Sequence, residues 1–156
     1  MKIMIFTVLF LTFFIVSLKD AFPYTTKINI RTVSSLPIYA VETTTSKANM
    51  IAIIGGKGLR NTKGKSNNYL VTQKNIFTNA NLNFYLFPNP SKNENASYSL
   101  RAKKMQAERI LHLVRGIAER NSLPTYLVGF SRGAVDVATF AKLYPAKIKG
   151  IVIASG

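Results

Sequence analysis

The sequence contains no cysteine and no tryptophan, a single histidine, and only six acidic residues among its 156. Without cysteine, the chain can form no disulfide bond and no thiolate metal site. It also has no cysteine nucleophile and no cysteine that could carry a lipid anchor. The sequence indicates no metal site and no cofactor, and it points to no particular oligomeric state.

The shortage of acidic residues leaves a formal net charge of +15. Such a charge raises the possibility of a nucleic-acid or anionic-membrane partner. The basic residues, however, are scattered from Lys27 to Lys149, and no basic motif interleaved with aromatics, as in known nucleic-acid modules, is present. We therefore expect a solvated, lysine-rich surface and no nucleic-acid partner, with weak adhesion to anionic surfaces left open.

The N-terminus carries the longest apolar run of the chain. Lys2 precedes an uncharged apolar stretch over residues 3–18, which ends at Lys19 and Asp20. This pattern predicts that residues 1–21 form a signal peptide or an N-terminal membrane anchor, and that the protein is exported (periplasmic or secreted) or membrane-anchored. Cleavage after Ala21 would place Lys19 where a small residue is preferred, so an uncleaved anchor remains an alternative.

Residues 22–156 are long enough for one domain with one core. Strands are predicted at 27–33, 37–41, 50–54, 82–87, 126–128 and 148–154. One long helix is predicted from about residue 100 to 120, with Met105 in its apolar stripe and Arg101 outside it, and another over 134–144 before Pro145. This order predicts an α/β fold: an open, mostly parallel sheet with helices on both faces.

The strand predicted at 126–128 leads directly into Gly129-Phe130-Ser131-Arg132-Gly133, a G-x-S-x-G motif followed by a helix. A strand that turns sharply into a helix can hold a serine hydroxyl exposed for attack on a carbonyl. Gly129 and Gly133 then fit where a Cβ would collide across the turn. This context favours a nucleophilic serine over a serine in an ordinary turn, which is the alternative.

With these residues the chain resembles the α/β-hydrolase superfamily, in particular a poorly characterised bacterial branch. Residues 68–71 and 88–91, together with the G-x-S-x-G motif, are similar to that branch, and residues 50–54 look like the family's third strand. Residues 55–58, Gly-Gly-Lys-Gly, occupy the place of its oxyanion loop. The resemblance implies a Ser131 acyl-enzyme formed from a small-molecule acyl substrate. It also implies oxyanion donors at the backbone N–H groups of Arg132 and Gly56.

The acid and base of a catalytic triad would follow the serine in chain order. The only histidine, His112, precedes Ser131 within a predicted helix, where a structural role is favoured. Asp136 is expected to point away from the serine and to lie on the helix surface or pack against a neighbour. We therefore expect 22–156 to be a partial α/β-hydrolase domain, truncated after the strand that follows the serine. The triad acid and base would lie beyond Gly156, and this chain alone would have little esterase activity.

Two other functions remain open. A non-catalytic binding or membrane-associated module could use the same fold and its basic surface. A nucleotide-binding P-loop is the weaker alternative, because residues 58–66 place five residues, instead of four, between the first glycine and Gly-Lys-Ser. The extra residue changes which amides can converge on one phosphate.

Overall fold

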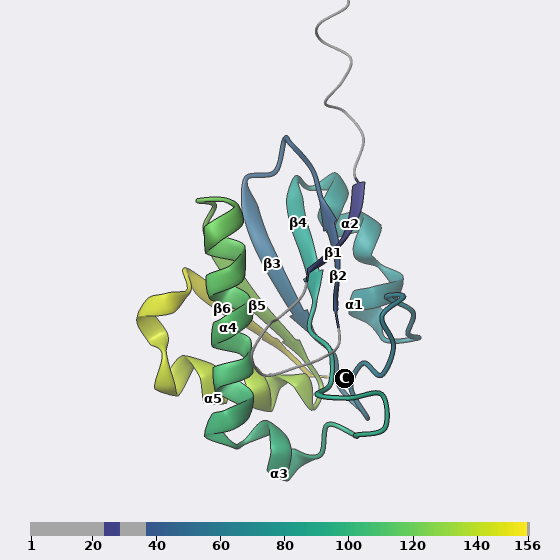
Figure 1. Cartoon of the computed structure of the whole chain (residues 1–156), viewed down its shortest axis with the longest axis vertical. Helices are drawn as coiled ribbons and strands as arrows, with labels where there is room; N and C mark the ends of the chain where they lie inside the picture. Colours follow the sequence, from purple (N-terminus) through teal and green to yellow (C-terminus); the bar gives the residue numbers. More distant parts are fainter. Residues whose placement is uncertain (1–23, 29–36, 156) are drawn as a thin grey trace, which may run out of the picture.

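The computed structural model describes residues 24–28 and 37–155. Within them, six strands form one sheet in the order β1-β2-β4-β3-β5-β6 (Figure 1). The strands are β1 Tyr24–Ile28, β2 Ile38–Glu42, β3 Ala48–Ile53, β4 Leu82–Leu86, β5 Thr125–Phe130 and β6 Gly150–Ala154. The pairs β4–β3, β3–β5 and β5–β6 are parallel, whereas β1 and β2 run antiparallel to their neighbours. This confirms the predicted open, mostly parallel sheet.

Helices cover both faces of this sheet. On one face, α4 (Lys104–Arg120) and α5 (Gly133–Leu143) pack their apolar side chains on β2, β3, β4 and β5. On the other face, the short helices α1 (Tyr69–Thr72) and α2 (Lys74–Asn79) cover a second cluster. Every residue of β3 is buried, because this strand has a neighbour on each side and a cluster on each face. The sheet therefore has a central strand that cannot shift without disturbing both clusters.

The parallel strands place two loops at one edge of the sheet. Ile53 at the end of β3 is paired with Gly129 near the end of β5. The residues that follow these strands, Gly55 and Ser131, therefore lie at the same edge, where parallel α/β sheets bind their ligands.

The single helix predicted over 100–120 is wrong in one respect. The structure forms α3 (Tyr98–Arg101) and α4, separated by Ala102 and Lys103, with Lys103 in an extended conformation. In a continuous helix, residues 101 and 106 would lie about 140° apart around the axis. The break allows Arg101 and Gln106 to reach the same partner, Asp136. Met105, expected in the apolar stripe, lies in the first turn of α4 and is 48% exposed.

Some sequence-based expectations fall outside the described residues. The leader at 1–21 and most of the strand expected at 27–33 are among them, so the predicted export or anchoring stays a prediction. In the described part of the chain, no helix is long and apolar enough to cross a membrane.

Candidate active site

Ser131 occupies the sharp turn between β5 and α5. Its φ is 53°, in the left-handed region, which a non-glycine residue adopts at a cost of roughly 1–3 kcal/mol. Its N–H donates to the carbonyl of Ala154 at 2.8 Å, and its own carbonyl accepts from Ala134 at 2.9 Å. The backbone of the serine is thus fixed on both sides, by β6 and by the first turn of α5.

The glycines around Ser131 allow two backbones to approach closely. A Cβ at Gly133 would lie 2.0 Å from the carbonyl oxygen of Ile53 in β3. A Cβ at Gly129 would lie 2.6 Å from the carbonyl oxygen of Gly133, across the turn. Both separations are shorter than real Cβ contacts allow, so the helix can start this close to the sheet only because both positions are glycine.

The strain at Ser131 has a measurable consequence. We expect Ser131→Gly to be more stable than Ser131→Ala by about 1 kcal/mol, because only glycine adopts a φ of 53° without a Cβ penalty. The two variants would be compared by urea unfolding. Ser122, whose φ is not positive, is the control: there we expect the alanine variant to be the more stable. Equal stabilities of the two Ser131 variants would contradict a strained turn.

The loop of residues 55–58, which we call the glycine loop, rests directly on this turn. A Cβ at Gly55 would lie 2.7 Å from the Cβ of Ser131 and 2.8 Å from the carbonyl oxygen of Phe130. Gly56 has a φ of +57° and open space where its Cβ would be, and Gly58 donates to the carbonyl of Gly55 at 3.0 Å. Among the described residues, no protein acceptor receives the N–H of Gly56 or of Arg132. Two backbone donors are therefore available beside Ser131.

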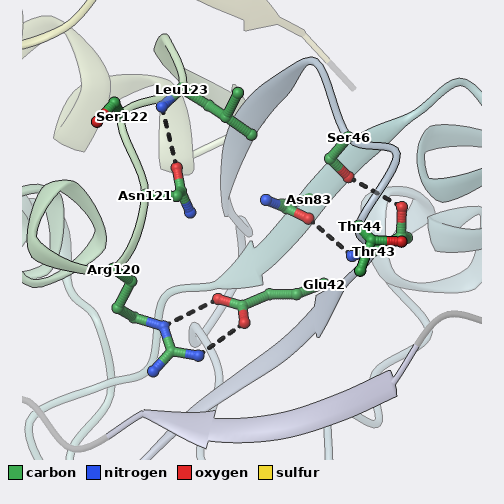
Figure 2. Close-up of a pocket in the computed structure, with 9 residues that line it drawn as sticks. All are labelled: Glu42, Thr43, Thr44, Ser46, Asn83, Arg120, Asn121, Ser122 and Leu123. Carbon is green, nitrogen blue, oxygen red and sulfur yellow. Dashed lines mark hydrogen bonds and ion pairs between the residues drawn. The ribbon is translucent and has the colours of Figure 1, made fainter. Parts of the chain in front are cut away.

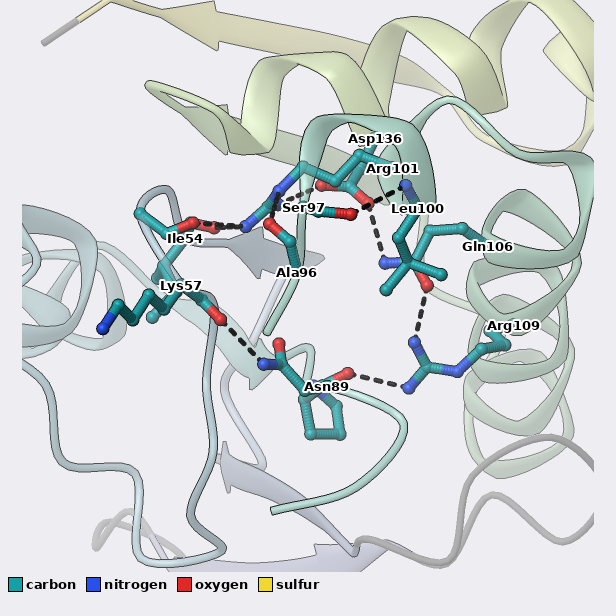
Figure 3. Close-up of polar contacts among 12 residues, drawn as sticks. Ile54, Lys57, Asn89, Ala96, Ser97, Leu100, Arg101, Gln106, Arg109 and Asp136 are labelled. Atoms are coloured by element: carbon teal, nitrogen blue, oxygen red, sulfur yellow. Dashed lines mark hydrogen bonds and ion pairs between the residues drawn. The ribbon is translucent and has the colours of Figure 1, made fainter. Parts of the chain in front are cut away.

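A buried polar network lies behind the glycine loop (Figure 3). Asp136 of α5 is fully buried, and its two carboxyl oxygens accept from Arg101 Nη1 and, at 2.8 Å, from Gln106 Nε2. Gln106 in turn accepts from Arg109 at 2.6 Å, and Arg109 donates to the carbonyl of Pro88 at 2.8 Å. The network connects α3, α4, α5 and the segment after β4.

The same network reaches the glycine loop through its carbonyl groups. Arg101 Nη2 donates to the carbonyl of Ile54 at 3.1 Å and to that of Gly56 at 3.4 Å. Asn89 Nδ2 donates to the carbonyl of Lys57 at 2.8 Å. The carbonyl oxygens of Ile54, Gly56 and Lys57 therefore point toward buried donors. The opposite side of the glycine loop faces Ser131 and solvent.

Burial governs the ionisation of the network. Desolvation raises the pKa of Asp136, while the adjacent Arg101 guanidinium and the hydrogen bond from Gln106 oppose that rise. Both carboxyl oxygens accept hydrogen bonds, the pattern of the ionised form. Burial also lowers the pKa of Arg109 to about 10, so this side chain is still charged at neutral pH. With two guanidinium groups and one carboxylate, the region behind the glycine loop carries a net positive charge.

Comparison with known proteins identifies the fold. No protein-family model and no curated protein sequence matches the chain. Among solved structures, it superposes on the Thermus thermophilus protein TT1662 with a TM-score of 0.61 and 17% identity over 86% of this chain. It superposes on a dienelactone hydrolase of Anabaena variabilis with a TM-score of 0.62 and 14% identity over 85% of this chain. The chain has the α/β-hydrolase fold.

The chain spans 58% and 62% of the lengths of these two proteins. A bacterial brefeldin A esterase, described as a homologue of human hormone-sensitive lipase, also superposes, with a TM-score of 0.55 and 15% identity. This chain covers 38% of that esterase, and 83% of the chain is matched. At identities this low, the superpositions show a shared fold.

Two tyrosines flank Ser131 in this α/β-hydrolase fold. The ring of Tyr69 from α1 stacks on Phe130, with centroids 6.2 Å apart. The guanidinium of Arg132 lies 4.9 Å from the ring centroid of Tyr98 in α3. Both tyrosines are more than half exposed, so their rings lie at the surface against the residues immediately before and after the serine.

The structure brings no base to Ser131 from the residues it describes. None of them hydrogen-bonds to the serine hydroxyl. His112 is half-buried in the middle of α4. Asp136 is committed to Arg101 and Gln106 and packs in the core, as expected for a residue turned away from the serine. The roles assigned to Ser131 and to the two amide donors from sequence stay predictions.

A pocket with polar side chains lies at the opposite edge of the sheet, and Figure 2 shows the residues that line it. It has a volume of about 580 Å³ and lies beside the strand ends that are remote from Ser131. Its charged side chains bind each other: Arg120 donates to both carboxyl oxygens of Glu42, at 3.0 and 2.7 Å. Tyr85 donates to Glu42 at 2.7 Å, and burial raises the pKa of its phenol. This arrangement connects β2 and β4 to the end of α4 beside the pocket.

The near-match to a P-loop folds differently from a phosphate cradle. The Asn61 side chain accepts from the amides of Lys63 and Lys65, at 3.0 and 3.3 Å, and donates to the carbonyl of Lys65. These amides are used within the loop, so they are not free to converge on a phosphate. In the described part of the chain, no three acidic or histidine side chains are grouped as a metal site would require.

Proposed function

We propose that Ser131 is the nucleophile of a serine hydrolase that cleaves an ester, amide or similar acyl bond. The observation that carries the proposal is the strained conformation of Ser131 beside two unused backbone donors, those of Gly56 and Arg132. A hydroxyl held in such a turn is exposed for attack, and paired N–H groups are the usual means of stabilising the resulting oxyanion.

In the proposed reaction, Oγ of Ser131 attacks the substrate carbonyl carbon while a general base removes the hydroxyl proton. The carbonyl oxygen becomes an oxyanion that accepts hydrogen bonds from Gly56 and Arg132. The tetrahedral intermediate then expels the alcohol or amine, which takes a proton, and leaves an acyl-Ser131. A water molecule, deprotonated by the base, then attacks the acyl carbon, and the second tetrahedral intermediate expels Oγ of Ser131, which takes back the proton as the carboxylic acid is released.

The fold neighbours support this chemistry in general terms, since they include a dienelactone hydrolase and a brefeldin A esterase. The substrate we propose is a small acyl compound, with Tyr69 and Tyr98 beside its acyl or leaving group. The general base is not supplied by any described residue. We therefore expect the isolated chain to turn over esters slowly, even if Ser131 reacts with a covalent probe.

The test is labelling of the chain with a fluorophosphonate, followed by peptide mass spectrometry. The probe forms a tetrahedral phosphorus adduct whose oxygen imitates the oxyanion. We expect Ser131 to be labelled about 10²-fold faster than Ser122, the scale of one oxyanion donor. Added imidazole should increase the Ser131 rate, because it provides the missing base.

Ser131→Ala should remove the label, and Ser122→Ala should leave it unchanged. Labelling spread evenly over the serines, with no effect of Ser131→Ala, would contradict the proposal. That outcome would favour a non-catalytic module on the same fold.

A further inference from the structure

We propose that Arg101 is a positioning residue that orients the N–H of Gly56 toward the oxyanion, and that Asp136 ties this orientation to the helix following Ser131. The inference rests on the proposed function, because it concerns the oxyanion donors of the same site. It assigns a role to a residue that does not touch the substrate.

One guanidinium nitrogen of Arg101 binds the carbonyl groups on both sides of the peptide unit that carries the Gly56 N–H. The N–H of Gly56 belongs to the Gly55–Gly56 peptide unit. The carbonyl before that unit, of Ile54, and the carbonyl after it, of Gly56, both accept from Arg101 Nη2. Because both flanking peptide planes are held by the same nitrogen, the plane between them has little freedom to rotate. This constraint matters here, because two successive glycines would otherwise make the loop very flexible.

The other nitrogens of Arg101 hold its guanidinium in place. Nε donates to the carbonyl of Ala96 at 3.0 Å, and Nη1 pairs with Asp136. Asp136 lies in α5, the helix whose N-cap is Arg132, the second proposed donor. One rigid group thus connects the loop carrying one donor to the helix next to the other. Arg101 is 1% exposed and Asp136 is 0% exposed, so water does not compete for these bonds.

A purely structural role explains this arrangement less well. A buried ion pair often contributes no more to stability than a well-packed apolar pair of similar volume. Packing alone therefore does not require a charged fork at this position. A planar guanidinium, in contrast, can donate to the carbonyls of Ile54 and Gly56 while it pairs with Asp136, because its N–H groups point in several fixed directions.

The experiment compares three variants of the whole chain. Arg101→Lys keeps the charge opposite Asp136 but loses the planar fork. The double variant Arg101→Met/Asp136→Leu removes both charges together and so leaves neither one buried alone. The control, Glu42→Gln/Arg120→Met, removes the ion pair at the opposite edge of the sheet, while the amide oxygen of the new glutamine side chain would still accept from Tyr85.

The first readout is hydrogen exchange of the Gly58 amide, which donates to Gly55 within the glycine loop, measured relative to the amides of Ile51 and Leu127 in the central strands. We expect this relative rate to rise at least about 10-fold in the double variant, less in Arg101→Lys, and not at all in the control. An unchanged relative rate in a folded double variant would overturn the proposal. If the double variant does not fold, Arg101→Lys decides in the same way.

The second readout is the fluorophosphonate reaction at Ser131, resolved into probe affinity and the rate constant of the bound complex. We expect the rate constant to fall about 10- to 100-fold with little change in affinity, because a misaligned donor acts on the tetrahedral state. Equal losses in the control variant would indicate a general effect of stability and overturn the proposal. If the unmodified chain is not labelled at Ser131, the proposed function fails, and Gly58 exchange alone then decides whether Arg101 orders the loop.

Discussion

Replacing Gly133 with alanine is expected to destabilise the fold by about 3 kcal/mol or more. The new methyl group would lie 2.0 Å from the carbonyl oxygen and 2.8 Å from the carbonyl carbon of Ile53. These are backbone atoms of β3, which is hydrogen-bonded to β4 on one side and to β5 on the other. Neither the strand nor the start of α5 can move without breaking these ladders, so the clash has no inexpensive relief.

The matched control is Gly116→Ala in α4, where a Cβ would meet nothing within 4 Å. There we expect alanine to stabilise the protein by roughly 0.5–1 kcal/mol, because it favours the helix over the unfolded chain. Both free energies of unfolding would be obtained from urea titrations followed by circular dichroism. If Gly133→Ala were as stable as the wild type, helix α5 could not start as close to β3 as described.

Replacing Asp136 with alanine is expected to cost about 3–5 kcal/mol of stability. The change leaves the Arg101 guanidinium buried with no opposite charge, and it removes the acceptor of Gln106. Burial also prevents water from solvating the unpaired charge, as it would at the surface. The loss should therefore far exceed that of an exposed ion pair of the same chemistry.

Glu108→Ala provides that comparison. Glu108 pairs with Lys104 one turn away on the exposed side of α4, at 3.3 Å. We expect its removal to cost less than about 0.5 kcal/mol. The double variant Arg101→Met/Asp136→Leu should be more stable than Asp136→Ala, because it no longer leaves the Arg101 guanidinium buried without its carboxylate. A single Asp136→Ala variant as stable as Glu108→Ala would mean that Arg101 is not buried against this carboxylate.

Much of the architecture follows from local sequence patterns. Apolar runs bounded by Pro88 and by the glycines after Ile54 and Val128 predicted the strands, and their alternation with helices predicted the parallel sheet. The turn at Ser131 was recognisable because a strand, a G-x-S-x-G motif and a helix follow one another. These signals are local, because each one is contained in a short stretch of consecutive residues.

The network behind the glycine loop could not be read in the same way. Helical periodicity placed Arg101 on the polar side of one long helix, whereas the structure buries it just before a break that no glycine or proline marks. The cause is a contact with Asp136, 35 residues away. One signal was present: Asp136 is the only charged residue in the first turns of an otherwise apolar helix, a position that indicates a buried partner.

The contact between Gly55 and Ser131 also depends on long-range order. Sequence patterns placed both residues at the carboxyl ends of strands but did not establish that β3 and β5 are adjacent. The observed register, with Ile53 opposite Gly129, brings Gly55 against the serine. Strand adjacency is set by the packing of the whole sheet, so this part of the site required the structure.

The most direct test of the central claim is a crystal structure of the chain with a phosphonate attached to Ser131. The account predicts that the phosphoryl oxygen lies roughly 2.7–3.1 Å from the backbone nitrogens of both Gly56 and Arg132. It also predicts that Arg101 still donates to the carbonyl of Gly56. An adduct whose oxygen points into solvent, with both amides unengaged, would contradict the assignment of this edge of the sheet as an acyl-transfer site.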